Sequence, residues 1–166
     1  MKREPEEVIV MSEATYQQLM AWRQEKETVG YVITHRQSNA QHIIWPLIVS
    51  KLGSGTATAI EREDYDKEMA QSLTDLVTSN PDMPLILMPT HSHPIEGLSE
   101  QDEATMFKQA GEGYNHHLIV TPKKVRAYRT DLDIGIITEL QVAKVTTFAV
   151  PMWVFETANL LTAISA

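Results

Sequence analysis

Residues 84–102 read PLILMPTHSHPIEGLSEQD, a stretch that joins an apolar run to a polar, helix-forming segment. Residues 84–88 are apolar and bounded by prolines, which is typical of a short buried strand. Ser99 can act as the N-cap of a helix, which we expect to run from about Glu100 to Ala110 with Gly111 in the C′ position. A buried strand followed by a helix is typical of an α/β or α+β domain.

The sequence on either side of this stretch predicts further strands and helices. We expect strands at residues 8–11, 28–34, 41–49, 117–121, 125–129 and 139–145. We expect helices after the N-cap Ser12, over residues 65–77 and from Trp153 onward, with a loop at Gly53-Ser54-Gly55. This order predicts a single α/β (α+β) domain over residues 1–166, with a mixed β-sheet flanked by helices.

The composition limits the kinds of site that this chain can build. It has 14 Lys and Arg residues, 22 Asp and Glu residues and no Cys, which gives a net charge of −8. Without Cys there is no disulfide, thiolate nucleophile, Cys-type zinc finger or iron–sulfur site. The acidic balance disfavours nucleic acid as the main partner, because binding to phosphates requires a basic surface. Any metal ion must therefore be held by His, Asp or Glu.

Two terminal segments bear on where the protein works. Residues 1–7 become acidic at once and lack an apolar stretch, so we expect no secretory signal and a cytoplasmic protein. Residues 146–166 are apolar, but Pro151 and Glu156 interrupt them, so we expect no membrane-spanning helix. This segment is expected to pack as a last helix or to form a homodimer contact, because an exposed apolar stripe is a liability in a monomer.

The residues that carry chemistry lie within the quoted stretch. His91 and His93 are separated by one residue, and the side-chain period of a strand is two, so both imidazoles point to the same face. Ser99 and Asp102 stand at positions i and i+3 at the start of the expected helix, so they also share a face. Two imidazoles and one carboxylate form a ligand set that leaves a fourth tetrahedral position for water, as in catalytic zinc sites.

Ordinary structural roles explain each part of this pattern as well. Two histidines at a strand end are often surface or hydrogen-bonded residues, and Ser99 followed by acids is common helix-capping chemistry. On these residues alone, a metal site and a capped helix beside two histidines are both open interpretations. His116 and His117 are interpreted as satisfied or surface histidines, with contact to the site or to a substrate as the alternative.

A larger pattern resembles the JAMM (JAB/MPN+) zinc metalloprotease family, and within it a compact prokaryote-type member. The matching residues are Glu27 and Gly30 in Glu-x-x-Gly, His91, His93 and Pro94 in His-Ser-His-Pro, and Ser99 and Asp102 in Ser-x-x-Asp. The likeness covers about residues 6–130 and leaves C-terminal strands and a helix at 135–166. It implies the MPN/JAB fold, which is cytidine deaminase-like. The five residues between His93 and Ser99 form a shorter connection than the family usually has.

The resemblance also implies a function and a role for each residue. His91, His93 and Asp102 would hold Zn²⁺, which activates a water molecule. Glu27 would act as general base, and Ser99 would donate a hydrogen bond to the oxyanion. The implied enzyme is a deubiquitinase-like isopeptidase or peptidase that hydrolyses the bond after the C-terminal tail of a ubiquitin-like protein or its conjugate. Some such domains belong to bacterial conjugation or antiviral-defence systems.

Two other functions of the same fold stay open at this point. The first is a non-catalytic MPN-type scaffold, which the shortened connection before Ser99 keeps in consideration. The second is a RadC-like, DNA-associated JAB protein, although the sequence shows no stripe of Lys and Arg that would favour it.

Overall fold

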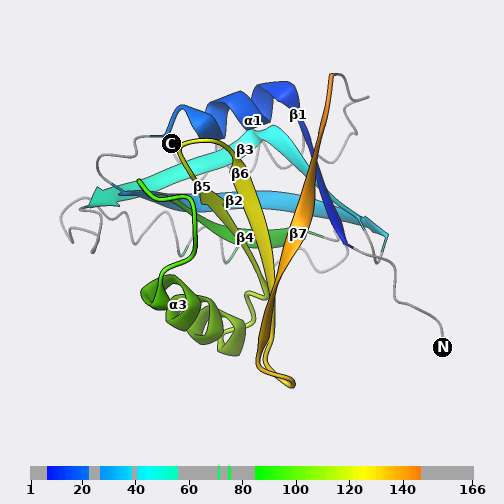
Figure 1. The fold of residues 1–166 in the computed structure, drawn as a ribbon. Coiled ribbons are helices and arrows are strands. Elements are labelled where there is room, and N and C mark those ends of the chain that lie inside the picture. The colour runs from blue at the N-terminus through cyan, green and yellow to red at the C-terminus, as the bar shows by residue number, and fades with distance from the viewer. Residues whose placement is uncertain are drawn as a thin grey trace.

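A computed structural model describes residues 7–22, 27–38, 41–55, 71, 75 and 85–146 (Figure 1). The strands in these ranges are β1 (Val8–Ser12), β2 (Glu27–Ser38), β3 (Gln41–Gly55), β4 (Leu85–Ser92), β5 (His116–Val120), β6 (Val125–Asp131) and β7 (Ile136–Val145). The helices with described bounds are α1 (Glu13–Met20) and α3 (Glu100–Gly111). The predicted mixture of strands and helices is confirmed for this part of the chain.

The strands form one mixed sheet that curls until it closes on itself. Their order is β1-β3-β2-β4-β5-β6-β7, and β1 pairs with both β3 and β7. β1 is parallel to both of these neighbours and β4 is parallel to β5, whereas the other adjacent strands are antiparallel. Because the sheet closes, the strands at the two ends of this order pair with each other instead of leaving open edges.

Helices α1 and α3 cover opposite sides of the sheet, with α1 above it and α3 below it in Figure 1. The buried apolar side chains divide in the same way. The larger cluster lies against α1 and contains Ile9, Met11, Leu19, Trp22, Val32, Met88, Leu118, Val120, Val125, Ala127 and Leu140. The smaller cluster joins Met106 of α3 to Ile119 and Tyr128 of the sheet. Successive residues of β5 alternate between the two clusters, so this strand is buried along its whole length.

The segment Gly53-Ser54-Gly55, predicted as a loop, is instead the last part of β3. It pairs with residues 27–29 of β2, and the register shifts between Val29 and Gly30. Glycine has a low strand propensity, but pairing with a neighbouring strand overrides that preference at an irregular position. As a result, the first residues of β2 lie within the sheet.

Helix α3 ends one residue later than the sequence predicted, and its C′ position lies two residues later. Gly111 is its last residue and Glu112 is its C-cap, so the C′ position belongs to Gly113, whose φ is +101°. The Gly113 N–H donates to the carbonyl of Ala110, and the Tyr114 N–H donates to the carbonyl of Gln109. These two bonds form a Schellman motif, which requires a residue with positive φ at C′.

Several predictions fall wholly or partly outside the described residues. Gln71 and Asp75 are helical, in agreement with the helix predicted over residues 65–77, whose other residues are not described. The helix predicted from Trp153 and the homodimer segment also lie outside the described ranges. Within these ranges, no helix has both the length and the apolar character needed to cross a membrane.

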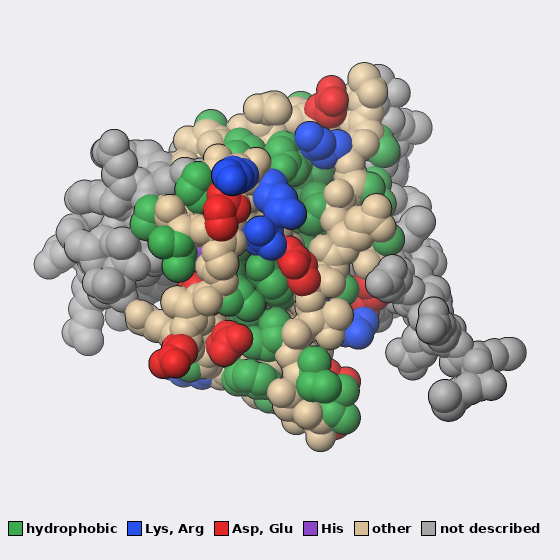
Figure 2. Space-filling view, in the orientation of Figure 1, with side chains coloured by type: hydrophobic (Ala, Val, Ile, Leu, Met, Phe, Trp, Pro, Cys, Tyr) green, Lys and Arg blue, Asp and Glu red, His purple; other side chains and the backbone are tan. Residues whose placement is uncertain are grey.

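The face shown in Figure 2 carries charges of both signs, and Asp and Glu side chains lie among those of Lys and Arg. Among the described residues, the exposed large apolar side chains are Ile95, Leu132, Ile134 and Ile136. The last three surround the turn between β6 and β7, whereas Ile95 belongs to the connection between β4 and α3.

The Schellman motif predicts opposite effects for the two glycines near the end of α3. Gly113→Ala should lower the free energy of unfolding by about 1–2 kcal/mol, because an L-residue is strained at positive φ. Gly111→Ala is the matched control, and it should stabilise by about 0.5–1 kcal/mol because alanine favours helical backbone. A Cβ atom meets nothing within 4 Å at either position, so steric clashes do not confuse the comparison. Thermal unfolding measures both, at about 2–4 °C per kcal/mol, and equal shifts would contradict the C′ assignment.

Candidate metal centre

The end of β4 carries two buried histidines. The strand continues past Met88, where the apolar run ends, to Ser92. His91 pairs with Val29 of β2 and Ile119 of β5, and the N–H of His93 donates to the carbonyl of Val120 at 3.0 Å. The two residues are 9% and 3% exposed. Buried imidazoles need polar or cationic partners, so this end of the strand is suited to a metal-binding site.

Asp102 reaches the same place from the first turn of α3. Ser99 is the N-cap of this helix, and its Oγ accepts a hydrogen bond from the Asp102 N–H at 3.1 Å. In return, Oδ2 of Asp102 accepts from the Ser99 N–H at 3.0 Å. This reciprocal capping box confirms the capping role predicted for Ser99, and it also fixes the direction in which the carboxylate points.

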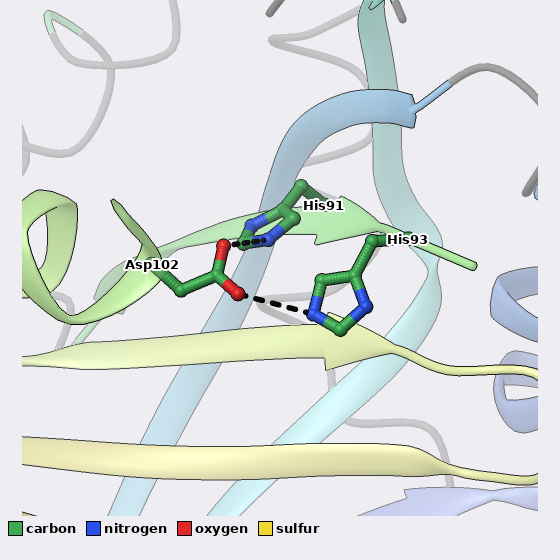
Figure 3. Close-up of side chains that lie close together, drawn as sticks. All are labelled: His91, His93 and Asp102. Carbon is green, nitrogen blue, oxygen red and sulfur yellow. Dashed lines mark hydrogen bonds and ion pairs between the residues drawn. The ribbon is translucent and has the colours of Figure 1, made fainter. Parts of the chain in front are cut away.

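The two histidines and the aspartate converge on one point (Figure 3). Nε2 of His91 lies 3.1 Å from Oδ1 of Asp102, and Nε2 of His93 lies 3.3 Å from Oδ2. One ligand atom from each of the three residues lies within 4.8 Å of the others. Ligands around a tetrahedral ion, at about 2.0–2.1 Å from it, are about 3.3 Å apart. These three residues could therefore hold a metal ion.

The Asp102 carboxylate is ionised in this environment. Burial alone would raise its pKa, but the contacts with His91 and His93 and the hydrogen bond from the Ser99 N–H outweigh burial. Together they hold the pKa of Asp102 well below its ordinary value. A ligand that is already deprotonated does not have to release a proton when a metal ion binds.

Glu27, the expected general base, is the first residue of β2. Its backbone pairs with Gly55 of β3, and Val29 two positions later pairs with His91. The backbone of Glu27 therefore lies at the end of the sheet where β4 carries its histidines. Gly30 of the same motif pairs with Thr90 of β4, beside His91.

His117 contacts the site, which was only the alternative interpretation from the sequence. Its Nε2 lies 2.9 Å from Nδ1 of His91, and its Nδ1 lies 2.8 Å from Oε1 of Gln109 in α3. Burial, followed by the nearby His91, lowers the pKa of His117 well below its ordinary value, so this imidazole is neutral. Once the structure pairs His91 with Ile119, the side-chain period of two places His117 on the same face of β5 as Ile119.

His116 faces a different set of partners, as expected for a satisfied histidine. Its Nε2 lies 2.6 Å from Oε2 of Glu7, and Arg129 Nη1 donates to the other oxygen of Glu7 at 2.7 Å. Glu7 and His116 are both buried, so the contacts of Glu7 join the residue before β1 to β5 and β6 inside the fold.

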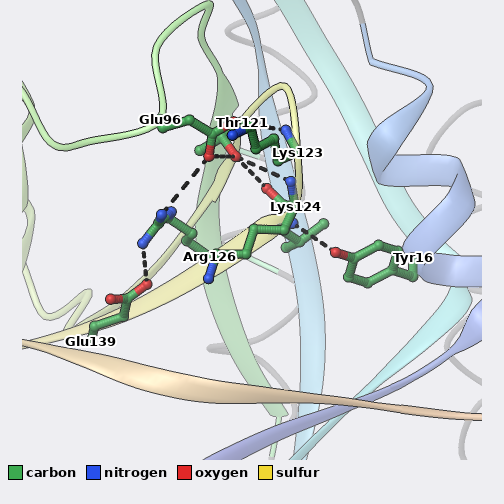
Figure 4. A network of polar contacts seen from close by, with 8 residues as sticks. Tyr16, Glu96, Thr121, Lys123, Lys124, Arg126 and Glu139 are labelled. Atoms are coloured by element: carbon green, nitrogen blue, oxygen red, sulfur yellow. Dashed lines mark hydrogen bonds and ion pairs between the residues drawn. The ribbon is translucent and has the colours of Figure 1, made fainter.

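Glu96 fixes the position of the connection between His93 and Ser99 (Figure 4). The Glu96 carboxylate accepts hydrogen bonds from Thr121 Oγ1 and from the Lys123 N–H, each at 2.8 Å. Arg126 lies 3.8 Å from the same carboxylate and is paired with Glu139 at 2.7 Å. The turn between β5 and β6 therefore anchors the segment that leads into α3.

The comparisons with known proteins do not decide what this site does. No family model matches the chain, and no curated protein matches it.

The Glu96 anchor predicts a stability effect that depends on one carboxylate. Glu96→Ala should lower the free energy of unfolding by about 1–2 kcal/mol, because hydrogen bonds to a charged group are lost. Lys123→Ala is the control, since Lys123 uses its backbone N–H for this contact, and it should leave the stability nearly unchanged. Thermal unfolding measures both at about 2–4 °C per kcal/mol. Equal losses in the two variants would contradict the anchoring role.

Proposed function

We propose that this chain is a zinc-dependent isopeptidase or peptidase of the JAMM type, with the MPN/JAB fold. Its substrate is the bond that follows the C-terminal tail of a ubiquitin-like protein or its conjugate. The observation that carries the proposal is the convergence of His91, His93 and Asp102 on one point. The substrate class comes from the resemblance of the motif Glu-x-x-Gly, His-Ser-His-Pro and Ser-x-x-Asp to this family.

The donor set favours zinc over other common metal ions. Imidazole nitrogen and carboxylate oxygen are ordinary zinc ligands, whereas Mg²⁺ and Ca²⁺ prefer oxygen alone. Three protein ligands leave an open position, which is the pattern of catalytic zinc. When bound, the ion would supply Lewis acidity that polarises a carbonyl group and lowers the pKa of water.

The residues of the chain supply the remaining steps. Glu27 takes the proton from the attacking water and passes it to the leaving amine, as a general base that becomes a general acid. The hydroxyl of Ser99 accepts from the Asp102 N–H, and its own hydrogen stays available to donate to the oxyanion of the tetrahedral intermediate. Ser99 therefore has a capping role and a catalytic role at the same time.

Zinc content and cleavage together test the proposal. We expect freshly purified protein to hold one zinc ion per chain by elemental analysis, and His93→Ala to lose it. We expect cleavage of ubiquitin-like fusions that stops on addition of a chelator. Glu27→Gln should keep the zinc and cleave about 10²–10⁴-fold more slowly, because a general base contributes that much. Glu13→Gln, the same change on an exposed position of α1, is the matched control and should cleave normally.

The outcomes separate the proposed enzyme from the alternatives. Protein without any bound metal would contradict the zinc hydrolase. Bound zinc without cleavage of any fusion would favour a scaffold of the same fold. Binding of DNA in preference to a ubiquitin-like protein would favour the RadC-like alternative.

Two substitutions of Ser99 separate its two roles. Ser99→Ala removes the cap and should lower the free energy of unfolding by about 1 kcal/mol. Ser99→Gly is well tolerated at an N-cap and should change stability by only a few tenths of a kcal/mol. Both variants lack the hydroxyl, so both should lower kcat by about 10²–10³-fold if it stabilises the oxyanion. Normal kcat in Ser99→Gly would show that the residue only caps the helix.

A further inference from the structure

A chain of side-chain contacts leads from the candidate metal centre into the fold. Nε2 of His91 lies 3.1 Å from Oδ1 of Asp102, and Nδ1 of His91 lies 2.9 Å from Nε2 of His117. Nδ1 of His117 lies 2.8 Å from Oε1 of Gln109. Gln109 stands in the last turn of α3, where its carbonyl accepts from the Tyr114 N–H. The chain therefore begins and ends on the same helix and passes through two strands of the sheet.

The Gln109 end determines where the hydrogens of this chain lie. An amide oxygen only accepts hydrogen bonds, so Nδ1 of His117 carries a hydrogen and donates it. A neutral imidazole has one N–H, so Nε2 of His117 has a lone pair and accepts. The donor that faces it is the Nδ1–H of His91. His91 then has a lone pair at Nε2, the atom that faces Asp102.

We infer that Gln109 and His117 are positioning residues that hold His91 in the tautomer that binds a metal ion. In this tautomer, Nε2 of His91 and Oδ1 of Asp102 face each other across 3.1 Å with no hydrogen between them. The Asp102 carboxylate by itself favours a hydrogen on Nε2 of His91, so the acceptor that His117 presents to Nδ1 is what leaves a lone pair on Nε2 for a cation. Outer contacts of this kind orient ligating histidines in known metal sites. The inference rests on the proposed function in taking that cation to be zinc.

The opposite direction of the chain is the alternative to exclude. If the amide nitrogen of Gln109 faced His117, every hydrogen would move to the other ring nitrogen, and His91 would donate from Nε2 to Asp102. That hydrogen would have to leave before His91 could bind zinc. A chain of hydrogen bonds that only stabilises the fold can have its hydrogens in either arrangement. A chain that prepares His91 to bind zinc needs the hydrogen on Nδ1 of His91.

The tautomers of the metal-free protein give the first test. In the full-length chain labelled with ¹⁵N, long-range ¹H–¹⁵N spectra show which ring nitrogen of each histidine carries a hydrogen. We expect the Nδ1–H tautomer for both His91 and His117. The Nε2–H tautomer for both residues would overturn the inference.

Zinc affinity gives the second test, measured by competition with a chromophoric chelator. His117→Leu removes the acceptor for His91 and should weaken zinc binding about 10–100-fold. His117→Gln can place an amide oxygen where Nε2 stood, so it should recover most of this loss. His116→Gln is the matched control, because His116 pairs with Glu7, and it should leave the zinc Kd unchanged. An unchanged Kd in His117→Leu would overturn the inference.

A second position keeps the test decisive if His117→Leu does not fold. Gln109 is only partly buried, and Gln109→Leu should weaken zinc binding in the same direction by removing the acceptor at the end of the chain. Gln109→Glu keeps an acceptor and should retain tight binding. Equal Kd values for Gln109→Leu and Gln109→Glu would contradict the positioning role.

The two proposals fail in different ways. Tight zinc binding that depends on His117, without cleavage of any fusion, would contradict the proposed function and support the positioning role. Zinc-dependent cleavage with an unchanged Kd in His117→Leu would contradict the positioning role and support the proposed function.

Discussion

The carboxylate of Asp102 is the group on which the arrangement of the site depends. It is mostly buried, and a buried anion is costly unless hydrogen bonds or positive charges surround it. One of its oxygens accepts from the N–H of Ser99, and its two oxygens face His91 and His93. These contacts require the start of α3 to lie against the end of β4. The hydrogen bond from Ser99 and the contact with His93 help to keep the carboxylate ionised, so the demands of folding and of metal binding act in the same direction.

The two halves of the candidate site could be predicted from local rules, but their convergence could not. The period of two places His91 and His93 on one face, and the capping pattern places Asp102 in the first turn of a helix. Nothing in either rule brings the two faces together. The five-residue spacing left a metal site as one of two open interpretations, and the family resemblance favoured it. His117 lies 26 residues from His91, and their contact depends on the parallel pairing of β4 with β5. A single sequence does not contain that register, so the contact stood only as an alternative.

The fold shows the same division between local and distant causes. The cap of α1 at Ser12 and the cap of α3 at Ser99 follow from side chains that bind backbone N–H groups within the same turn, and both were predicted. The end of β3 and the end of α3 were misplaced. Gly53-Ser54-Gly55 is held as a strand by β2, which is distant in sequence, and α3 ends where Gly113 permits the Schellman bonds to form. A glycine in the sequence indicates that a positive φ is possible at that position. It does not show which of two nearby glycines adopts it.

The short connection between β4 and α3 gives the site its second constraint. Five residues must turn the chain from His93 to Ser99, and Glu96 in the middle of them is bound to Thr121 and Lys123. The start of α3 is thus fixed by Glu96 on one side and by Asp102 on the other, and neither contact involves a metal ion. Ligands that the fold already holds at 3.1 and 3.3 Å need little movement to bind an ion. Because less ordering remains for the binding step, a connection of this length favours a preformed site rather than one that assembles around the metal.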